Sequence, residues 1–217
     1  MNRRAMASDH PFCSKAARGA ALLLAVAGLP LFAGCDRQQS TAVAAAQRPP
    51  LEGSTIGGEF ALVDKNGKTV RYSDFAGKYR IVYFGYSFCP DACPLDVQKL
   101  MQGFTLFEKA EPKVAAQVQP IFISIDPERD TPAVVGQFAA AFSPRLLGLT
   151  GSPEAVAAAA KKFAAYYAKG ETTPGGGYLM DHSRTAFLMD RDGKPLAILP
   201  IDQSPQAVAA EIARWTH

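Results

Sequence analysis

The strongest constraint on the fold is the segment YRIVYFGY at positions 79–86, which two cysteines follow closely. β-Branched and aromatic residues dominate this segment, as is typical of a buried central strand. From Pro94 onward, apolar residues recur at three- and four-residue spacing through Phe107, which is the pattern of an amphipathic helix. The sequence therefore predicts a strand that leads through a Cys-X3-Cys turn into a helix.

Strand and helix signals alternate along the rest of the chain. Asn-Gly at 66–67 lies between two extended segments and predicts a β-hairpin, and Asp-Gly at 192–193 predicts another. Residues 118–126 (VQPIFISID) resemble a second buried strand, and residues 145–150 (RLLGLT) resemble a short one. Three further helices are expected to open with a hydroxyl N-cap and a proline, at Thr131-Pro132, Ser152-Pro153 and Ser204-Pro205.

This order, β-α-β followed by a hairpin and a final helix, predicts an α/β chain with a thioredoxin-like fold. Such a fold has a central mixed sheet with helices on both faces, here with an added N-terminal β-hairpin. The segment KGETTPGGGY at residues 169–178 interrupts the pattern. Its three successive glycines have no side chains to pack, so we expect this stretch to be mobile.

The N-terminus has the composition of a bacterial export leader. Basic residues precede an apolar run at residues 19–33, which is shorter than the roughly 20 residues that span a bilayer. The run ends in LFAGC, which resembles a lipobox whose Cys35 is lipidated, and Asp36 resembles a signal for retention at the inner membrane. We therefore expect a signal peptide with lipobox at 1–34, a flexible membrane tether at 35–55 and the folded domain at 56–217.

An uncleaved anchor helix and plain secretion are the alternatives for this leader. All three place the domain in an extracytoplasmic space, at the periplasmic face of the bacterial inner membrane if it is anchored, where a cysteine pair meets oxidising conditions. The leader holds four basic and one acidic side chain, which leaves 19 of each sign from the totals of 23 basic and 20 acidic. A balanced domain with no basic patch argues against nucleic acid as a partner.

Cys89 and Cys93 lie where the predicted strand ends and the predicted helix begins. A helix N-terminus favours thiolate over thiol, and the i, i+4 spacing would put both sulfurs on one helical face. That arrangement suits a metal chelate at least as well as a dithiol switch. A structural disulfide, a metal-free redox pair and a zinc site are alternatives, although a closed zinc site needs four protein ligands. Cys13 falls in the leader and Cys35 at the tether, so neither is expected to contribute.

Three histidines are present, and only His182 is placed to join the cysteine pair. His10 falls in the leader, and His217 is the last residue. His182 precedes a strand that we expect beside the strand at 79–86, so its loop should approach the cysteines. A lone histidine in a loop is otherwise a surface or hydrogen-bonding residue. Two thiolates and one imidazole form a soft ligand set that suits copper, as Cu+ or as Cu2+.

The loop DPERDTP, which follows the second predicted strand, allows two interpretations. In the first, Asp126, Arg129 and Asp130 form a loop that is held together by ion pairs and a helix cap. In the second, Asp126 lies near the cysteine pair, where it orients a metal ligand or offers a weak axial oxygen.

Four motifs together resemble the SCO/SenC family of copper proteins. They are FGYSFCPDACP, FISIDPERDTP, LTG and DHSRTAFLMDRDG, which occur in the family's order between about residues 57 and 199. The resemblance implies a membrane-tethered, thioredoxin-like domain that helps to assemble the CuA centre of cytochrome c oxidase. It also places the family's metal ligands at Cys89, Cys93 and His182. Phe88 stands where the family often carries a histidine or another residue, and we do not expect it to remove a ligand.

The resemblance further implies a copper metallochaperone that can also reduce a disulfide in the target's copper site, so whether the chain is also an enzyme stays open. The expected partner is the oxidase subunit that carries the CuA site. Other periplasmic copper carriers and a thioredoxin-like reductant are further expected partners, and the chain would reach the membrane through a lipid or a helix anchor. The reduced Cys89–Cys93 dithiol can take up copper, whereas the disulfide cannot. A metal-independent thiol–disulfide oxidoreductase and a copper- or redox-sensing module are the alternative functions.

Overall fold

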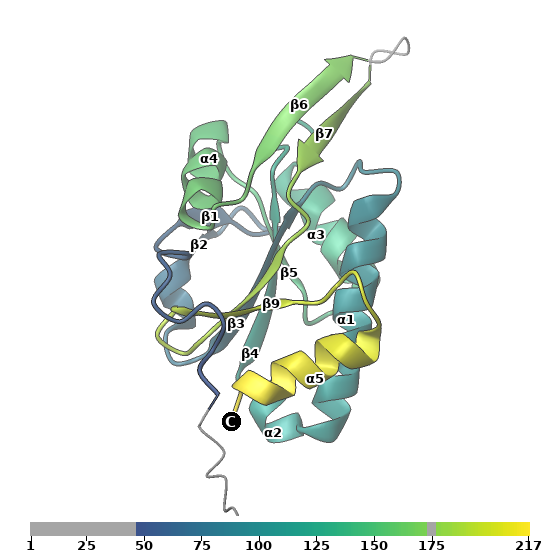
Figure 1. Cartoon of the computed structure of the whole chain (residues 1–217). Helices are drawn as coiled ribbons and strands as arrows, with labels where there is room; N and C mark the ends of the chain where they lie inside the picture. The colour runs from purple at the N-terminus through teal and green to yellow at the C-terminus, as the bar shows by residue number, and fades with distance from the viewer. Residues whose placement is uncertain (1–46, 173–176) are drawn as a thin grey trace, which may run out of the picture. The chain divides into compact units, whose positions relative to one another are not determined.

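The segment at 79–86 forms β3 (Tyr79–Gly85), the middle strand of a five-stranded sheet. The structure is a computed structural model, and it describes residues 47–172 and 177–217. β3 pairs in parallel with β4 (Val118–Ser124) and antiparallel with β8 (Ala186–Met189). The strand order is β5-β4-β3-β8-β9, with β5 (Leu147–Leu149) and β9 (Pro195–Leu199) at the two edges (Figure 1). This mixed α/β sheet confirms the predicted fold class.

Side chains of β3 alternate between two apolar cores because successive residues of a strand point to opposite faces. Ile81 and Tyr83 belong to one core, whereas Val82 and Phe84 belong to the other. The first core is covered by helices, namely α1 (Ala92–Ala110), α2 (Pro112–Ala115), α3 (Pro132–Phe142) and α5 (Pro205–Trp215). The second is covered by α4 (Pro153–Lys162), the hairpin of β1 (Ala61–Val63) and β2 (Thr69–Arg71), and the 3-10 helix η1 (Tyr72–Phe75).

The local signals for helix starts and hairpins are confirmed. The side chains of Thr131, Ser152 and Ser204 each accept a hydrogen bond from a backbone N–H in the first turn of the helix that follows. β1 pairs antiparallel with β2, and β8 pairs antiparallel with β9. Gly67 and Gly193 adopt φ values of 73° and 80° in the two turns, a conformation that glycine adopts without steric cost.

The expectation of a mobile stretch at 169–178 is wrong for its described part. β6 (Tyr167–Thr172) and β7 (Tyr178–His182) form a separate two-stranded antiparallel ribbon, which extends past one end of the central sheet (Figure 1). Residues 173–176 lie outside the described residues. Cross-strand contacts explain the order, because the Lys169 ammonium lies 4.0 Å from the ring centroid of Tyr178 on the opposite strand.

Side chains of β7 alternate in exposure along the ribbon. Tyr178, Met180 and His182 turn toward the body of the domain, whereas Leu179 and Asp181 are exposed. Met180 is 9% exposed and packs in the second core. One face of β7 is therefore turned toward the domain, with Met180 buried and His182 at the end of that face.

The expected signal peptide, lipobox and most of the tether fall on residues 1–46, which lie outside the described residues. In the described part of the tether, the Leu51 backbone N–H donates to the Leu196 carbonyl at 3.0 Å, and its side chain packs against the second core. Contacts with the domain thus begin before residue 56. Among the helices of the described residues, none is both long and apolar enough to cross a membrane.

Candidate metal centre

The two cysteines flank the start of α1, but they do not share a helical face as the sequence spacing suggested. α1 begins at Ala92, so Cys93 lies in its first turn and Cys89 lies in the turn before the helix. The N-cap residue, Asp91, has φ −143° and ψ −73°, which stops the helix from continuing back through Pro90. The Cys93 backbone N–H instead donates to the Cys89 Sγ at 3.3 Å, and both cysteines are free thiols.

His182 reaches the cysteine pair from the end of β7 rather than from a loop. Its Nε2 lies 3.0 Å from the Cys93 Sγ, and its Nδ1 lies 3.0 Å from the Ser183 carbonyl oxygen. A carbonyl oxygen only accepts, so Nδ1 carries the proton of the neutral ring and Nε2 presents its lone pair to Cys93. This is the tautomer that a metal ligand bound through Nε2 requires.

Two buried tyrosines hold the imidazole ring between them. The ring centroid of Tyr83 lies 6.3 Å from that of His182, and the centroid of Tyr86 lies 6.0 Å away, both in edge-to-face geometry. Both tyrosines come from the end of β3, so the same strand that leads to the cysteines also supports the histidine. The apolar surroundings make the neutral form of the ring the favoured one.

Burial sets the ionisation of the three candidate ligands. Desolvation raises the pKa of the Cys93 thiol well above its ordinary value. The pKa of Cys89 is lowered, although desolvation alone would raise it. Hydrogen bonds to the Cys89 sulfur outweigh desolvation, and they come from the Cys93 and Asp91 backbone N–H groups, the Cys93 thiol and the Tyr86 hydroxyl. Desolvation lowers the pKa of His182. Cys89 is therefore the more readily ionised thiol, and His182 is neutral at pH 7.

A buried carboxylate near the site was missed by the sequence reasoning. Asp96 is 1% exposed, and it accepts hydrogen bonds from the Tyr83 hydroxyl at 3.1 Å and from the Arg184 guanidinium at 2.7 and 2.5 Å. A sequence signal did exist, because Asp96 lies three residues after Cys93 on the apolar face of the helix, and Arg184 lies two residues after His182. Their pairing depends on the fold, which brings α1 beside the end of β7.

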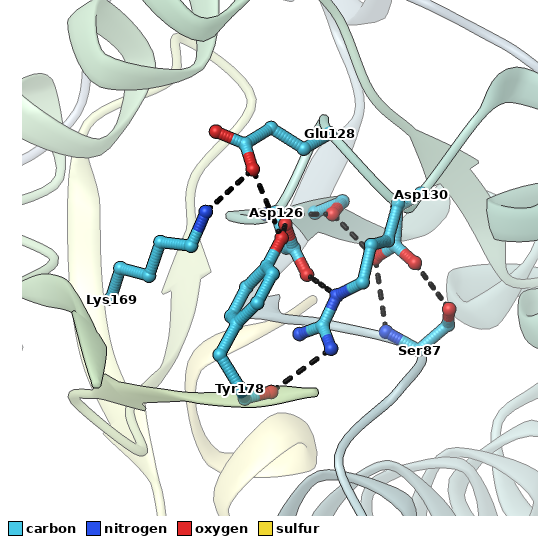
Figure 2. Close-up of polar contacts among 8 residues, drawn as sticks. Ser87, Asp126, Glu128, Asp130, Lys169 and Tyr178 are labelled. Carbon is cyan, nitrogen blue, oxygen red and sulfur yellow. Dashed lines mark hydrogen bonds and ion pairs between the residues drawn. The ribbon is translucent and has the colours of Figure 1, made fainter. Parts of the chain in front are cut away.

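Asp126 belongs to an ion-pair network at the base of the ribbon, as the first interpretation of its loop predicted. It is 2% exposed, pairs with the Arg129 Nε at 2.5 Å and accepts from the Tyr178 hydroxyl at 2.7 Å (Figure 2). Arg129 also donates to the Tyr178 carbonyl at 2.9 Å and stacks on its ring, 3.6 Å from the centroid. The Phe88 side chain is half exposed, and its ring centroid lies 5.0 Å from the Arg129 Cζ. The Asp126 carboxylate is hydrogen-bonded to Arg129 in its own loop and to Tyr178 on the ribbon, and its backbone N–H donates to the Ser124 hydroxyl. None of these hydrogen bonds joins it to the cysteines or His182.

Asp130 ties the turn that precedes Cys89 to the sheet. It is fully buried and accepts from the Ser87 backbone N–H at 3.0 Å, from the Ser87 hydroxyl and from the Ser124 hydroxyl at 2.5 Å (Figure 2). Ser124 is the last residue of β4, and Ser87 lies two residues before Cys89. The carboxylate therefore fixes the position of the cysteine turn relative to the end of β4.

The arrangement unites the three predicted ligands without forming a closed metal cage. The Cys93 Sγ lies 3.0 Å from the His182 Nε2, and the Cys93 backbone N–H donates to the Cys89 Sγ. With the side chains as they stand, the described residues contain no group of three or more His, Cys, Asp or Glu side chains that could hold a metal ion. The site can act as a dithiol, and it can take a soft ion if the side chains of Cys89, Cys93 and His182 converge on one point.

Comparison with known proteins gives consistent matches over this domain. The SCO1/SenC family profile matches residues 48–217. The mouse protein named Protein SCO2 homolog, mitochondrial, is 43% identical over 136 residues, which cover 63% of this chain and 52% of that protein. Protein SenC of Rhodobacter capsulatus is 38% identical over 182 residues, which cover 83% of this chain and 75% of that protein.

A solved structure matches the same region. Copper-bound ScoI of Bradyrhizobium japonicum superposes with a TM-score of 0.66 at 38% sequence identity, over 74% of this chain and 99% of that one. The chain spans about half the length of the mouse and bovine SCO2 homologues that it matches.

Proposed function

Because the chain belongs to the SCO1/SenC family, we propose that it binds copper outside the cytoplasm and delivers it to the CuA-bearing subunit of cytochrome c oxidase. Copper is the cargo in this proposal. The copper-bound relative supports the choice of metal, and the soft ligand set of the site supports it independently.

The copper ligands in this proposal are Cys89, Cys93 and His182. The observation that carries the assignment is the 3.0 Å contact between the Cys93 Sγ and the His182 Nε2, because it joins two ligands that lie 89 residues apart in the sequence. The Ser183 carbonyl keeps the proton on Nδ1 and leaves Nε2 free to bind metal. Convergence of the three side chains on one point completes the set.

A second candidate function, reduction of a disulfide in the partner's copper site, is favoured by the difference between the two thiols. Cys89 has the lowered pKa and the greater exposure, so its thiolate attacks one sulfur of the target disulfide and expels the other as a thiolate. Cys93, once its proton has passed to the first target thiolate, then attacks the Cys89 sulfur of the mixed disulfide and releases the second target thiolate. Two electrons pass from the dithiol to the target, and the chain is left with a Cys89–Cys93 disulfide.

The place of action in this proposal is the periplasmic face of the inner membrane. The leader with Cys35 as the lipidated residue supports it, with an uncleaved anchor helix as the alternative. In this proposal the stretch between Cys35 and Leu51, where contacts with the domain begin, keeps the copper site within reach of a membrane-bound oxidase.

Copper binding tests the ligand assignment directly. The reduced full-length chain, in detergent and without oxygen, is titrated with copper(I) in competition with a chromophoric copper(I) chelator. We expect one copper per wild-type chain, strong loss of binding in Cys89→Ser and Cys93→Ser, and weakened binding with retained thiol exchange in His182→Ala. A His182→Ala chain that binds copper with unchanged affinity would refute the role given to His182.

A further inference from the structure

Among the described residues, the ribbon that carries His182 has no strand pairing with the central sheet. β6 and β7 form their own two-stranded sheet, whereas β3 leads into the helix that carries Cys93. A two-stranded ribbon is marginally stable by itself. β8 of the central sheet begins four residues after His182, so the backbone limits where the ribbon end lies. Side-chain contacts at that end set the finer position of His182 relative to Cys93.

Arg184 and Asp96 supply such a connection immediately beside the site. The Arg184 Nε lies 2.7 Å from the Asp96 Oδ2, and its Nη2 lies 2.5 Å from the Oδ1, so the guanidinium binds the carboxylate through two parallel hydrogen bonds. Arg184 is two residues after His182, and Asp96 is three residues after Cys93. A two-point contact fixes orientation as well as distance.

The environment of Asp96 makes this contact hard to replace. Asp96 is 1% exposed, and its remaining hydrogen-bond partner among the described contacts is the Tyr83 hydroxyl at 3.1 Å. The Tyr83 ring in turn packs edge-on against the imidazole of His182. One buried carboxylate thus orients both the chain that follows His182 and a ring that touches it.

We propose that Asp96 and Arg184 are positioning residues, which hold the imidazole of His182 against the Cys93 sulfur and thereby set the affinity for copper. This inference rests on the proposed function, and it concerns residues that bind no metal themselves. Groups that orient a metal-binding histidine typically change metal affinity 10- to 100-fold when they are removed. We expect an effect of that size from loss of this pair.

Two substitutions separate positioning from simple charge. Arg184→Ala removes a positive charge near the site, and Asp96→Asn removes a negative one. If long-range charge decided copper affinity, Arg184→Ala would raise it and Asp96→Asn would lower it. Positioning predicts that both substitutions lower copper(I) affinity, roughly 10- to 100-fold, and that Arg184→Lys falls between Arg184→Ala and the wild type because lysine keeps the charge without the two-point geometry.

The double variant Arg184→Ala/His182→Ala gives the sharpest test. If Arg184 acts through His182, the double variant binds copper(I) as His182→Ala does, whereas an independent effect would add to it. Arg145→Ala is the matched control, since Arg145 binds Glu108 and two carbonyl oxygens away from the site. We expect it to lower stability to denaturant and to leave copper affinity unchanged.

A readout without copper keeps this proposal distinct from the proposed function. The ring resonances of His182, followed by NMR in the reduced metal-free chain, report its packing against Tyr83 and Tyr86. We expect these resonances to shift in Arg184→Ala and Asp96→Asn and to stay in place in Arg145→Ala. If Arg184→Ala kept both the His182 ring resonances and the copper affinity of the wild type, the positioning role would be overturned. Unmeasurable copper binding by the wild type would overturn the proposed function, and the ring resonances would still decide the positioning role.

Discussion

Asp130 offers the most quantitative test of how the fold holds the cysteine turn. It is fully buried and accepts three hydrogen bonds, two from Ser87 and one from Ser124. In Asp130→Ala the two hydroxyl groups can turn to other acceptors, but the Ser87 backbone N–H cannot. A buried donor left without an acceptor costs about 1–3 kcal/mol, and the part-buried Ser87 N–H falls toward the lower end of that range. Loss of hydrogen bonds to a charged group costs about 1.5–3 kcal/mol.

We therefore expect Asp130→Ala to lower the free energy of unfolding by about 3–5 kcal/mol, a large part of the stability of an ordinary domain. Urea unfolding of the reduced, metal-free chain measures it. Asp64→Ala is the control, because the Asp64 carboxylate likewise accepts hydrogen bonds from backbone N–H groups, those of Asn66 and Lys68, but in an exposed hairpin turn. We expect a loss below about 1 kcal/mol there, since water replaces the carboxylate. Equal losses in the two variants would show that burial of the Asp130 network does not decide its contribution.

Two further predictions concern ionisation at the site. Burial lowers the pKa of His182 in the folded chain, so the unfolded chain binds a proton first as pH falls below the ordinary histidine value of about 6.5. Because of His182, the free energy of unfolding should therefore fall on acidification, by up to about 1.4 kcal/mol per pH unit. Urea unfolding between pH 7 and 5.5 should show a shallower pH dependence in His182→Gln than in the wild type. The same pH dependence in both chains would contradict this. Cys89 has the lowered pKa and the greater exposure, so it should react with iodoacetamide at pH 7 at least tenfold faster than Cys93. Mass spectrometry after limited alkylation measures the two rates. Equal rates would rule out Cys89 as the thiol that attacks the target disulfide first.

Elements with a complete local signal could be predicted from the sequence. The run at 79–86, the two Asn-Gly and Asp-Gly turns and the three hydroxyl-proline helix starts all form as expected. Strand propensity, turn conformation and helix capping each depend on a few neighbouring residues, so a short window contains the information. The fold class follows once these elements are placed in order.

Features that depend on distant partners could not be predicted in the same way. The ribbon at 167–182 forms because Tyr178 contacts Lys169 across the pair and Arg129 beneath it, and neither contact is visible in the composition of a glycine-rich segment. The Asp96–Arg184 pair likewise joins residues 88 positions apart. The i, i+4 spacing of the cysteines misled for a local reason, since it assumed a helix through Pro90 that the backbone at Asp91 does not allow.

The alternation of side chains along β7 constrains how the segment between Tyr178 and His182 can change in length. Inserting or deleting one residue there would turn the imidazole to the outer side, with Leu179 and Asp181, while a change of two would return it to the inner side. Length variation between Tyr178 and His182 should therefore be restricted to even steps.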